Sequence, residues 1–404
     1  MKRRTRGELP RSPGKPQFSQ RPGTLQSVAA LLLVLGALVR TASAEPAHHP
    51  VNLSFLYPLS TNRDPGISTS FRLNVFYARA GSVRGIDLGG LVARTDGDFR
   101  GLELALAHSW IGHDFRGLSA TGLVGVVGGN ARGLQFAGLV NFDRGRFNGA
   151  QAAGLFNAVA GDVRGVQFCS VYNSCEGDVR WLQAASVANV SAGSLTGIQL
   201  GSFNFAGRGA TGAQFGLCNS ATALHGVQAG ILNLAGAARG TQIGIVNIAQ
   251  RLDGLPLGLV NVVHDGGESD WLLLGSSLAA VSIGARTAVR GLYSMVSAGV
   301  GDLHDDESNT LFLDWHYGYA ADLGSRWRVG GDLGFVHIIP QPNDDPEVND
   351  RLHFAVQPRI LAETGIGKRL HVLAGVGASV IWNEYSSNAA PETDPLVVLG
   401  ISSK

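Results

Sequence analysis

Long apolar runs and cysteine are both scarce in this sequence of 404 residues. Beyond the N-terminal region no segment has the ~18 consecutive apolar residues that a transmembrane helix needs, so none is predicted in the mature chain. The odd number of cysteines (Cys169, Cys175 and Cys218) and the lack of a C-x-x-C spacing argue against a metal site. In an exported chain, Cys169 and Cys175 would either form a local disulfide or fill a core as small apolar side chains.

An excess of one charge is lacking as well. Lys and Arg number 32 and Asp and Glu 31, which argues against a dedicated nucleic-acid-binding protein, because such a protein would carry a basic stripe. A phosphate-binding G-x-x-x-x-G-K-[ST] loop is also absent. We therefore predict no nucleic-acid partner and no cofactor.

The first 44 residues are typical of a secretory signal peptide. Lys2, Arg3 and Arg4 give a basic start, an apolar run follows over residues 28–39, and Ala42-Ser43-Ala44 is an A-x-A cleavage site. The alternative is a membrane anchor, but this run is short against the ~20 residues of a bilayer span. We expect an exported chain that begins at Glu45.

Glycine is abundant, with 56 residues, and it follows a repeat that dominates residues 81–266. The third residue of each G-x-Q unit recurs every 16 residues from Asp87 to Gln199, then at 15 and finally at 14, which makes twelve rungs. A second column holds asparagine. The two columns are Gln135, Gln151, Gln167, Gln183, Gln199, Gln214, Gln228 and Gln242, and Asn141, Asn157, Asn173, Asn189, Asn204, Asn219, Asn233, Asn247 and Asn261.

Apolar residues alternate on both sides of the Gln slot, and this period of two predicts strands. A further apolar column runs through Phe99, Phe115, Phe147 and Val163, and a glycine column that includes Gly145 is expected at a corner with positive φ. The sequence predicts a twelve-rung β-solenoid with stacked Gln and Asn ladders, about 55–60 Å long. We expect Phe147 and Phe168 in its core and the Gln column on its surface. The alternative is a row of hairpins in a larger barrel, for which the repeat is short.

The flanking segments alternate between an apolar and a mixed face, as strands of an outer-membrane barrel do. Eight candidate strands are residues 70–79, 271–283, 290–300, 310–321, 327–338, 352–363, 370–382 and 396–402. Short turns near Arg286 and at 322–326 and 364–369 alternate with long polar loops at 301–309, 340–351 and 383–395. The domains expected are therefore residues 45–80 with the first barrel strand, the solenoid at 81–266 inserted between strands one and two, and the remaining antiparallel barrel strands at 267–404.

This arrangement gives the barrel an expected lipid face and two aromatic belts. Leu311, Trp315 and Tyr319 should face lipid, while Asp314 and His316 face inward. The belts expected are Trp271, Tyr77, Phe335 and Trp382 at the outer interface, and Phe71, Tyr293, Tyr319 and Trp327 at the inner one. A soluble sandwich is the alternative, since two-faced strands form those too.

The rungs at residues 226–233 and 240–247, together with the opening at 53–62, resemble the bacterial surface-repeat family built from tandem G-x-Q-x-G-x-x-N units. The resemblance covers most of the mature chain. It implies an exported envelope protein and supplies no catalytic residues. The first three rungs depart from it at the Asn slot, where Ala93, Ser109 and Gly125 stand.

Three sets of polar residues are candidates for chemistry, and for each a structural interpretation is favoured. They are a loop cluster for a divalent cation (Asp302, His304, Asp305, Asp306, Glu307), an inward barrel set (Arg72, Asp314, His316, Arg328, Asp332, His353, Gln357, Arg359, Glu363), and Ser379 with His337 as a lipid hydrolase. A solvated loop tip explains the first, and side chains that fill a narrow barrel explain the second. Strand alternation puts Ser379 and His337 on opposite faces, so they should not meet.

Taken together, these observations favour a non-catalytic protein of the outer membrane or cell surface, with lipid and an unidentified surface ligand as partners. Its repeat would be a rigid domain for adhesion or recognition. An outer-membrane barrel enzyme acting on lipid and a soluble periplasmic scaffold are the alternatives.

Overall fold

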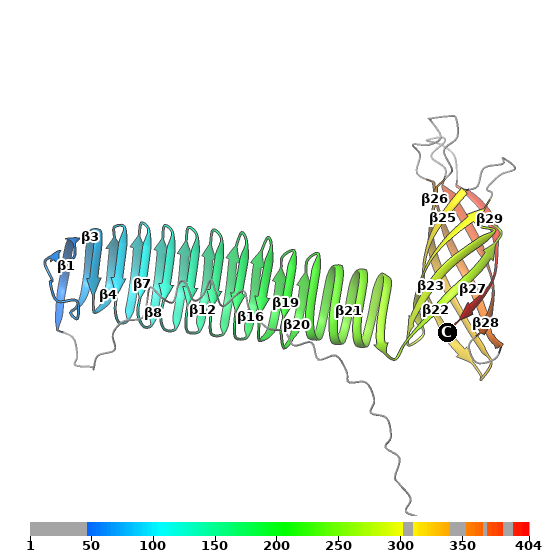
Figure 1. Ribbon diagram of the computed structural model, residues 1–404, viewed down its shortest axis with the longest axis horizontal. Helices are drawn as coiled ribbons and strands as arrows, with labels where there is room; N and C mark the ends of the chain where they lie inside the picture. Colours follow the sequence, from blue (N-terminus) through cyan, green and yellow to red (C-terminus); the bar gives the residue numbers. More distant parts are fainter. Residues whose placement is uncertain (1–46, 302–309, 340–352, 367–369, 383–390, 404) are drawn as a thin grey trace, which may run out of the picture. The chain divides into compact units, whose positions relative to one another are not determined.

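A computed structural model describes residues 47–301, 310–339, 353–366, 370–382 and 391–403. The expected signal peptide and the loop cluster of Asp302, His304, Asp305, Asp306 and Glu307 lie outside these residues, as does the His353 side chain. Every regular element in the described part is a β-strand, and no helix there is long and apolar enough to cross a membrane. The strands form a parallel β-solenoid and a closed antiparallel barrel (Figure 1).

The solenoid starts with β1 (His48–Leu56), β2 (Leu59–Ser60) and β3 (Ser68–Ala80). Each following rung has one long and one short strand. The long strands are β4 (Ser82–Gly89), β6 (Phe99–Ala105), β8 (Phe115–Thr121), β10 (Ala131–Ala137), β12 (Phe147–Ala153), β14 (Val163–Cys169), β16 (Val179–Ala185), β18 (Ser194–Leu200) and β20 (Gly209–Phe215). The short strands are β5 (Val92–Thr95), β7 (His108–Ile111), β9 (Val124–Val127), β11 (Val140–Asp143), β13 (Phe156–Val159), β15 (Tyr172–Cys175), β17 (Ala188–Ser191) and β19 (Phe203–Ala206). The last rungs form one continuous strand, β21 (Cys218–Asp265).

Long strands stack on long strands and short on short, in parallel and in register. Gln135 therefore pairs with Gln151, and Gln151 with Gln167. This register follows from the constant repeat length, because each residue type then meets its own kind in the next rung. The repeat columns of the sequence become rows along the solenoid, whose strands stack side by side in Figure 1.

One end of each rung encloses the apolar core. Phe99, Phe115, Phe147, Val163 and Leu195 are buried in one continuous cluster, as the third apolar column predicts. The cysteines are free: Cys175 is buried in the same cluster, and Cys169 is only partly buried. The buried-residue interpretation thus holds for Cys175, and the disulfide is absent.

The predicted role of the glycine column at Gly145 is wrong. Positive φ occurs instead in the column that includes Gly149 and Gly165, at 143° and 139°. Gly145 is required by packing between rungs, because a Cβ there would lie 2.5 Å from the Gly129 carbonyl oxygen. The spacing identified a constrained slot but not which constraint acts on it.

The Gln and Asn columns lie inside the other end of the rungs, between 0 and 3% exposed. From Gln151 onward, each Gln Nε2 donates to the Gln Oε1 of the preceding rung; Gln151 donates to Gln135 at 3.0 Å and Gln183 to Gln167 at 2.8 Å. The Asn column runs the opposite way, with Asn141 Nδ2 donating to Asn157 Oδ1 at 3.0 Å. The expected surface position of the Gln column is wrong, because stacked amides satisfy one another and so are buried at little cost.

Charged residues replace the amides at the start of this interior. Arg72, fully buried, donates to the Asp87 carboxylate and to the Arg94 carbonyl oxygen. Glu103 Oε2 accepts hydrogen bonds from Ser109 Oγ at 2.7 Å and Ser119 Oγ at 2.8 Å. Arg72 is therefore a solenoid residue, and its predicted place inside the barrel is wrong.

The buried Glu103 makes solenoid stability depend on pH. Burial, and then the Asp87 carboxylate, raises the pKa of Glu103 to about 7 from 4.5. Between these two pH values the folded state keeps a proton on Glu103 that the unfolded state releases. The contribution of Glu103 to the free energy of unfolding is therefore fully present below pH ~4.5 and is lost as pH rises to ~7. At ~1.4 kcal/mol per pH unit the loss is at most roughly 3–4 kcal/mol.

Glu103→Gln is expected to remove this share of the pH dependence and to stabilise the first rungs above pH ~7. Its Nε2 would be placed to donate to Asp87 as Gln151 donates to Gln135. Chemical denaturation between pH 4 and 8 measures the effect, with a residual slope expected from Asp143, whose pKa burial also raises to about 7. Equal slopes for the variant and the wild type would contradict the assignment.

The barrel is closed by eight antiparallel strands, with β22 paired to β29. They are β22 (Gly267–Ser276), β23 (Val281–Val289), β24 (Leu292–Gly301), β25 (Thr310–Leu323), β26 (Trp327–Ile339), β27 (His353–Ile366), β28 (Leu370–Trp382) and β29 (Glu392–Ser403). The predicted strand count is confirmed.

The predicted first barrel strand is wrong. Residues 70–79 lie in β3, which pairs in parallel with β1, β4 and β5 in the solenoid sheet. The missing strand comes from residues 271–283, which divide into β22 and β23 at a turn where Ser276 Oγ accepts from the Leu278 and Ala279 amides. The next turn is at residues 290–291, with φ of 52° and 86°, and Arg286 lies within β23. The whole barrel therefore follows the solenoid, which is not inserted between two of its strands.

Candidate functional site

The barrel exterior is apolar. Leu311, Trp315 and Tyr319 are exposed, and the alternating His316 is buried, as predicted. The exposed belt also contains Leu273, Ile283, Leu313, Val329, Leu333, Phe335, Ile360, Val376, Val397 and Leu399. An apolar surface that extends around a whole barrel is unfavourable in water. The belt is therefore expected to contact lipid or a partner protein.

The predicted aromatic belts are partly wrong. Phe71 and Tyr77 belong to the solenoid, and Tyr293 is buried inside the barrel. Trp271 pairs with Ser403 at the end of the C-terminal strand, away from the end where β25 and β26 pair through Leu311 and Ile339. Phe335, Phe354 and Trp382 do form an aromatic group near that second end, with stacked rings at 5.7 and 5.2 Å.

The barrel interior contains two ion-paired clusters. In the first, Arg286 donates to Asp270 Oδ2 at 2.6 Å and to Glu363 Oε2 at 2.8 Å, and Glu363 also accepts from Ser402 Oγ at 3.0 Å. His371 lies 2.9 Å from the same carboxylate. These charged groups are buried inside a narrow barrel, and their ion pairs offset the cost of removing them from water.

In the second cluster Asp332 is the shared acceptor. Arg359 donates to both of its oxygens, at 2.8 and 2.9 Å, Tyr293 Oη donates at 2.7 Å, and His316 Nδ1 lies at 3.3 Å. The predicted inward set thus divides. Asp332, His316 and Arg359 meet in this second cluster and Glu363 belongs to the first, whereas Arg328 pairs with Glu268 and Asp322 in a more exposed position. Asp314, partly buried, accepts from Ser297 Oγ at 3.0 Å.

The hydrolase candidate does not assemble. Ser379 is buried and accepts from Gln357 Nε2 at 3.3 Å, whereas His337 alternates with the buried Val336 and Ile338 and so faces outward. A serine nucleophile needs a base within hydrogen-bond reach, and Gln357 is not one. Within the described residues no group of three or more His, Cys, Asp or Glu is placed to hold a metal ion.

The solenoid has an exposed apolar edge where its interior is polar. We call this row of side chains the apolar edge; it consists of Leu91, Leu106, Leu123, Leu139, Leu155, Val187, Leu217, Ile231 and Ile245, which are 38 to 70% exposed. These residues follow the Gln slot by three or four positions, where most of the rungs bend. On the strand itself, alternation puts the Gln amide inside, so the apolar residues directly before and after it point out. Phe168, 45% exposed, lies outside for this reason, and its predicted place in the core is wrong.

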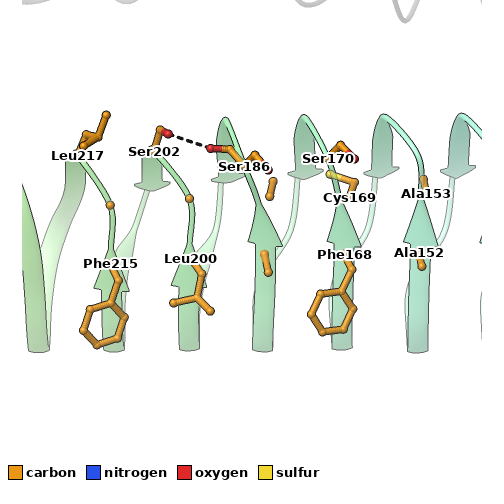
Figure 2. A pocket seen from close by; sticks show the side chains of 14 residues that line it. Ala152, Ala153, Phe168, Cys169, Ser170, Ser186, Leu200, Ser202, Phe215 and Leu217 are labelled. Atoms are coloured by element: carbon orange, nitrogen blue, oxygen red, sulfur yellow. Dashed lines mark hydrogen bonds between the residues drawn. The ribbon is translucent and has the colours of Figure 1, made fainter.

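A shallow depression of about 740 Å³ adjoins the apolar edge. Figure 2 shows Phe168, Leu200 and Phe215 projecting to one side of their strands, with the small Ala152 further along the same row. Ser202 Oγ, at the rim, donates to the Ser186 carbonyl oxygen at 2.8 Å. Large and small apolar side chains alternate along the depression, which makes its surface uneven but leaves it open. Such a surface suits recognition of a partner, whereas catalytic sites are usually enclosed.

Sequence reasoning missed one further feature of the solenoid. Three residues before the Gln slot, arginines stack in register in a row that we call the basic column: Arg84, Arg100, Arg116, Arg132, Arg164 and Arg180. All are exposed. The spacing of 16 that revealed the amide columns also contains this one, but the balanced net charge concealed it.

Comparison of the chain with family models, curated proteins and solved structures finds no match in any of the three. The resemblance of its rungs to a surface-repeat family therefore stays a prediction that rests on the motif alone.

Proposed function

We propose that this chain is a non-catalytic envelope protein, anchored in an outer membrane by its barrel, whose solenoid is a rigid recognition domain. The observation that carries the proposal is the apolar belt around a closed eight-stranded barrel with a polar, ion-paired interior. This distribution is the inverse of a soluble protein and the usual one for a barrel in lipid.

Strand topology favours the periplasmic side for the solenoid. The chain enters the barrel at Gly267, and β22 begins beside Val289, next to the tight turn at residues 290–291. The short connection at 324–326 and the end of β29 lie at this same end, while β24 ends at Gly301, beside the start of β25, at the opposite end. Outer-membrane barrels have their short turns in the periplasm.

The recognition surface that we propose is the apolar edge with its adjoining depression. It recurs in most rungs, and successive rungs are ~4.8 Å apart, so a partner with an extended apolar face would contact many similar sites. Rungs hold their shape through buried amide ladders, which keeps this surface rigid and lowers the entropic cost of binding.

Leu333→Arg tests the membrane anchor. Leu333 is 59% exposed on β26, and an arginine near the middle of the lipid face costs ~2–4 kcal/mol. We expect the variant to insert poorly into phosphatidylcholine vesicles and to lose the heat-modifiable folded band on a gel. The matched control is Leu106→Arg, at a 70% exposed solenoid position, which should insert normally.

Cells that express the protein test on which side of the membrane the solenoid lies. In intact cells trypsin should leave the arginine-rich solenoid uncut until the outer membrane is permeabilised. Normal insertion of Leu333→Arg would overturn the membrane barrel, and cleavage of the solenoid in intact cells would overturn its periplasmic position.

A further inference from the structure

The basic column carries charge that the chain itself does not neutralise. Arg84 pairs with Arg100, and Arg164 with Arg180, as direct Cα partners in neighbouring rungs, so these arginines repeat at ~4.8 Å along the solenoid axis. Among the residues that the structure describes, only Arg100 of this column has an ion pair, at 3.8 Å from Asp98. Adjacent like charges repel, so a column without counterions favours an external anion.

Aspartates lie close to this column but serve a different purpose. Asp98, Asp114, Asp162 and Asp178 precede four of the arginines by two residues. Their carboxylates accept from the backbone amide one rung on; Asp114 Oδ1 accepts from the Asn130 amide at 2.8 Å, and the others do so at 2.8 to 3.3 Å. They hold the corners of the rungs together, and apart from the Arg100–Asp98 pair the structure gives no ion pair between them and the basic column.

Trp181 supplies an independent observation beside the column. It follows Arg180 and occupies a slot that both neighbouring rungs fill with glycine, Gly165 and Gly197. Its φ is 111°, in a region that side chains with a Cβ rarely adopt, and its ring is 72% exposed. A strained residue that gains nothing from burial is the kind that function explains and packing does not.

We propose that Trp181, Arg164 and Arg180 form a binding site for an acidic glycan, extended along the basic column. The indole face offers a flat apolar platform for the C–H face of a sugar ring. Guanidinium groups bind carboxylate, sulfate or phosphate in a two-pronged geometry. Repetition of the charge along the solenoid suits a linear polymer with an acid on successive sugars. This site is separate from the apolar edge and does not depend on it.

The test uses the full-length protein in detergent micelles and polygalacturonate as the probe, with binding measured by tryptophan fluorescence and calorimetry. Trp181→Gly restores the residue of the neighbouring rungs, so it should melt no lower than the wild type while binding at least about tenfold more weakly. Arg164→Gln/Arg180→Gln should weaken binding similarly and reduce its salt dependence. The charge-matched control, Arg208→Gln/Arg251→Gln, and the aromatic control, Phe136→Ala, should bind as the wild type does.

Specificity is tested with uncharged dextran and with single-stranded oligothymidylate. Dextran should bind at least about tenfold more weakly than polygalacturonate, and the oligonucleotide likewise. Unchanged binding by Trp181→Gly or by the arginine pair would overturn the site. Equal binding of dextran would overturn the role of the acid, and equal binding of oligothymidylate would show a general polyanion surface in place of a glycan site.

Discussion

Gln151→Ala is expected to destabilise the surrounding rungs by roughly 3–5 kcal/mol, about as much as truncating the buried Phe147. Gln151 Nε2 donates to Gln135 Oε1 and to Asp143 Oδ2, both at 3.0 Å, and Gln151 Oε1 accepts from Gln167 at 3.0 Å. All these groups are buried. Alanine removes the hydrogen bonds and leaves two amides and a carboxylate short of partners, and each unsatisfied group costs ~1–3 kcal/mol.

The effect should stay local, because each rung contacts only its neighbours. Hydrogen exchange should therefore rise in the rungs from about Ala131 to Asn173, while amides near Asn247 keep their protection. The control is Phe168→Ala, one residue after the next Gln in the column, which removes a side chain that is 45% exposed and should change exchange little. If Phe168→Ala proved the more damaging substitution, the assignment of the two faces would be wrong.

The architecture of the solenoid was predictable because its evidence is periodic. A spacing of 16 that holds over eight successive rungs fixes the strand register, and alternation fixes which side chains share a face. The barrel strands were predictable for the same reason, since Leu311, Trp315 and Tyr319 alternate with buried partners. A local sequence pattern is sufficient to predict the strands where the fold repeats that pattern.

Which face is inside was not predictable from polarity. The rule that apolar side chains are buried chooses Phe168 over Gln167, and the structure does the reverse. An isolated buried glutamine would be costly, but Gln167 both donates to Gln151 and accepts from Gln183. The cost is removed by a neighbour one rung away, which single-rung reasoning does not include.

The error at residues 70–79 has a related cause. Phe71, Leu73 and Tyr77 alternate with polar residues as barrel strands do, and the pattern contains nothing about the partner strand. The parallel pairing of Arg72 with Asp87 in β4 places this strand in the solenoid, and that partner is 15 residues away in the sequence. The strands at 271–283 were merged because alternation continues across the turn at residues 277–280.

Arg286→Met is expected to be the most damaging single change inside the barrel. It removes the partner of Asp270 and of Glu363, whose side chains are 1 and 4% exposed. Breaking a buried ion pair by removing one partner costs ~3–5 kcal/mol, because the remaining charges are buried without compensation. Here two carboxylates are left, so the folded barrel should be lost at a markedly lower temperature, as followed by the heat-modifiable band in detergent micelles.

Two companion variants separate charge burial from loss of side-chain volume. Arg328→Met removes an arginine that also pairs with two carboxylates, Glu268 and Asp322, but its side chain is 24% exposed, so the expected cost is at most ~1 kcal/mol. The triple variant Arg286→Met/Asp270→Asn/Glu363→Gln neutralises the two carboxylates and should recover most of the lost stability, because neutral amides can be buried with Ser402 and His371 as hydrogen-bond partners. If the triple variant were no more stable than Arg286→Met alone, the arginine would act through packing, and the barrel interior would owe its stability to shape more than to charge pairing.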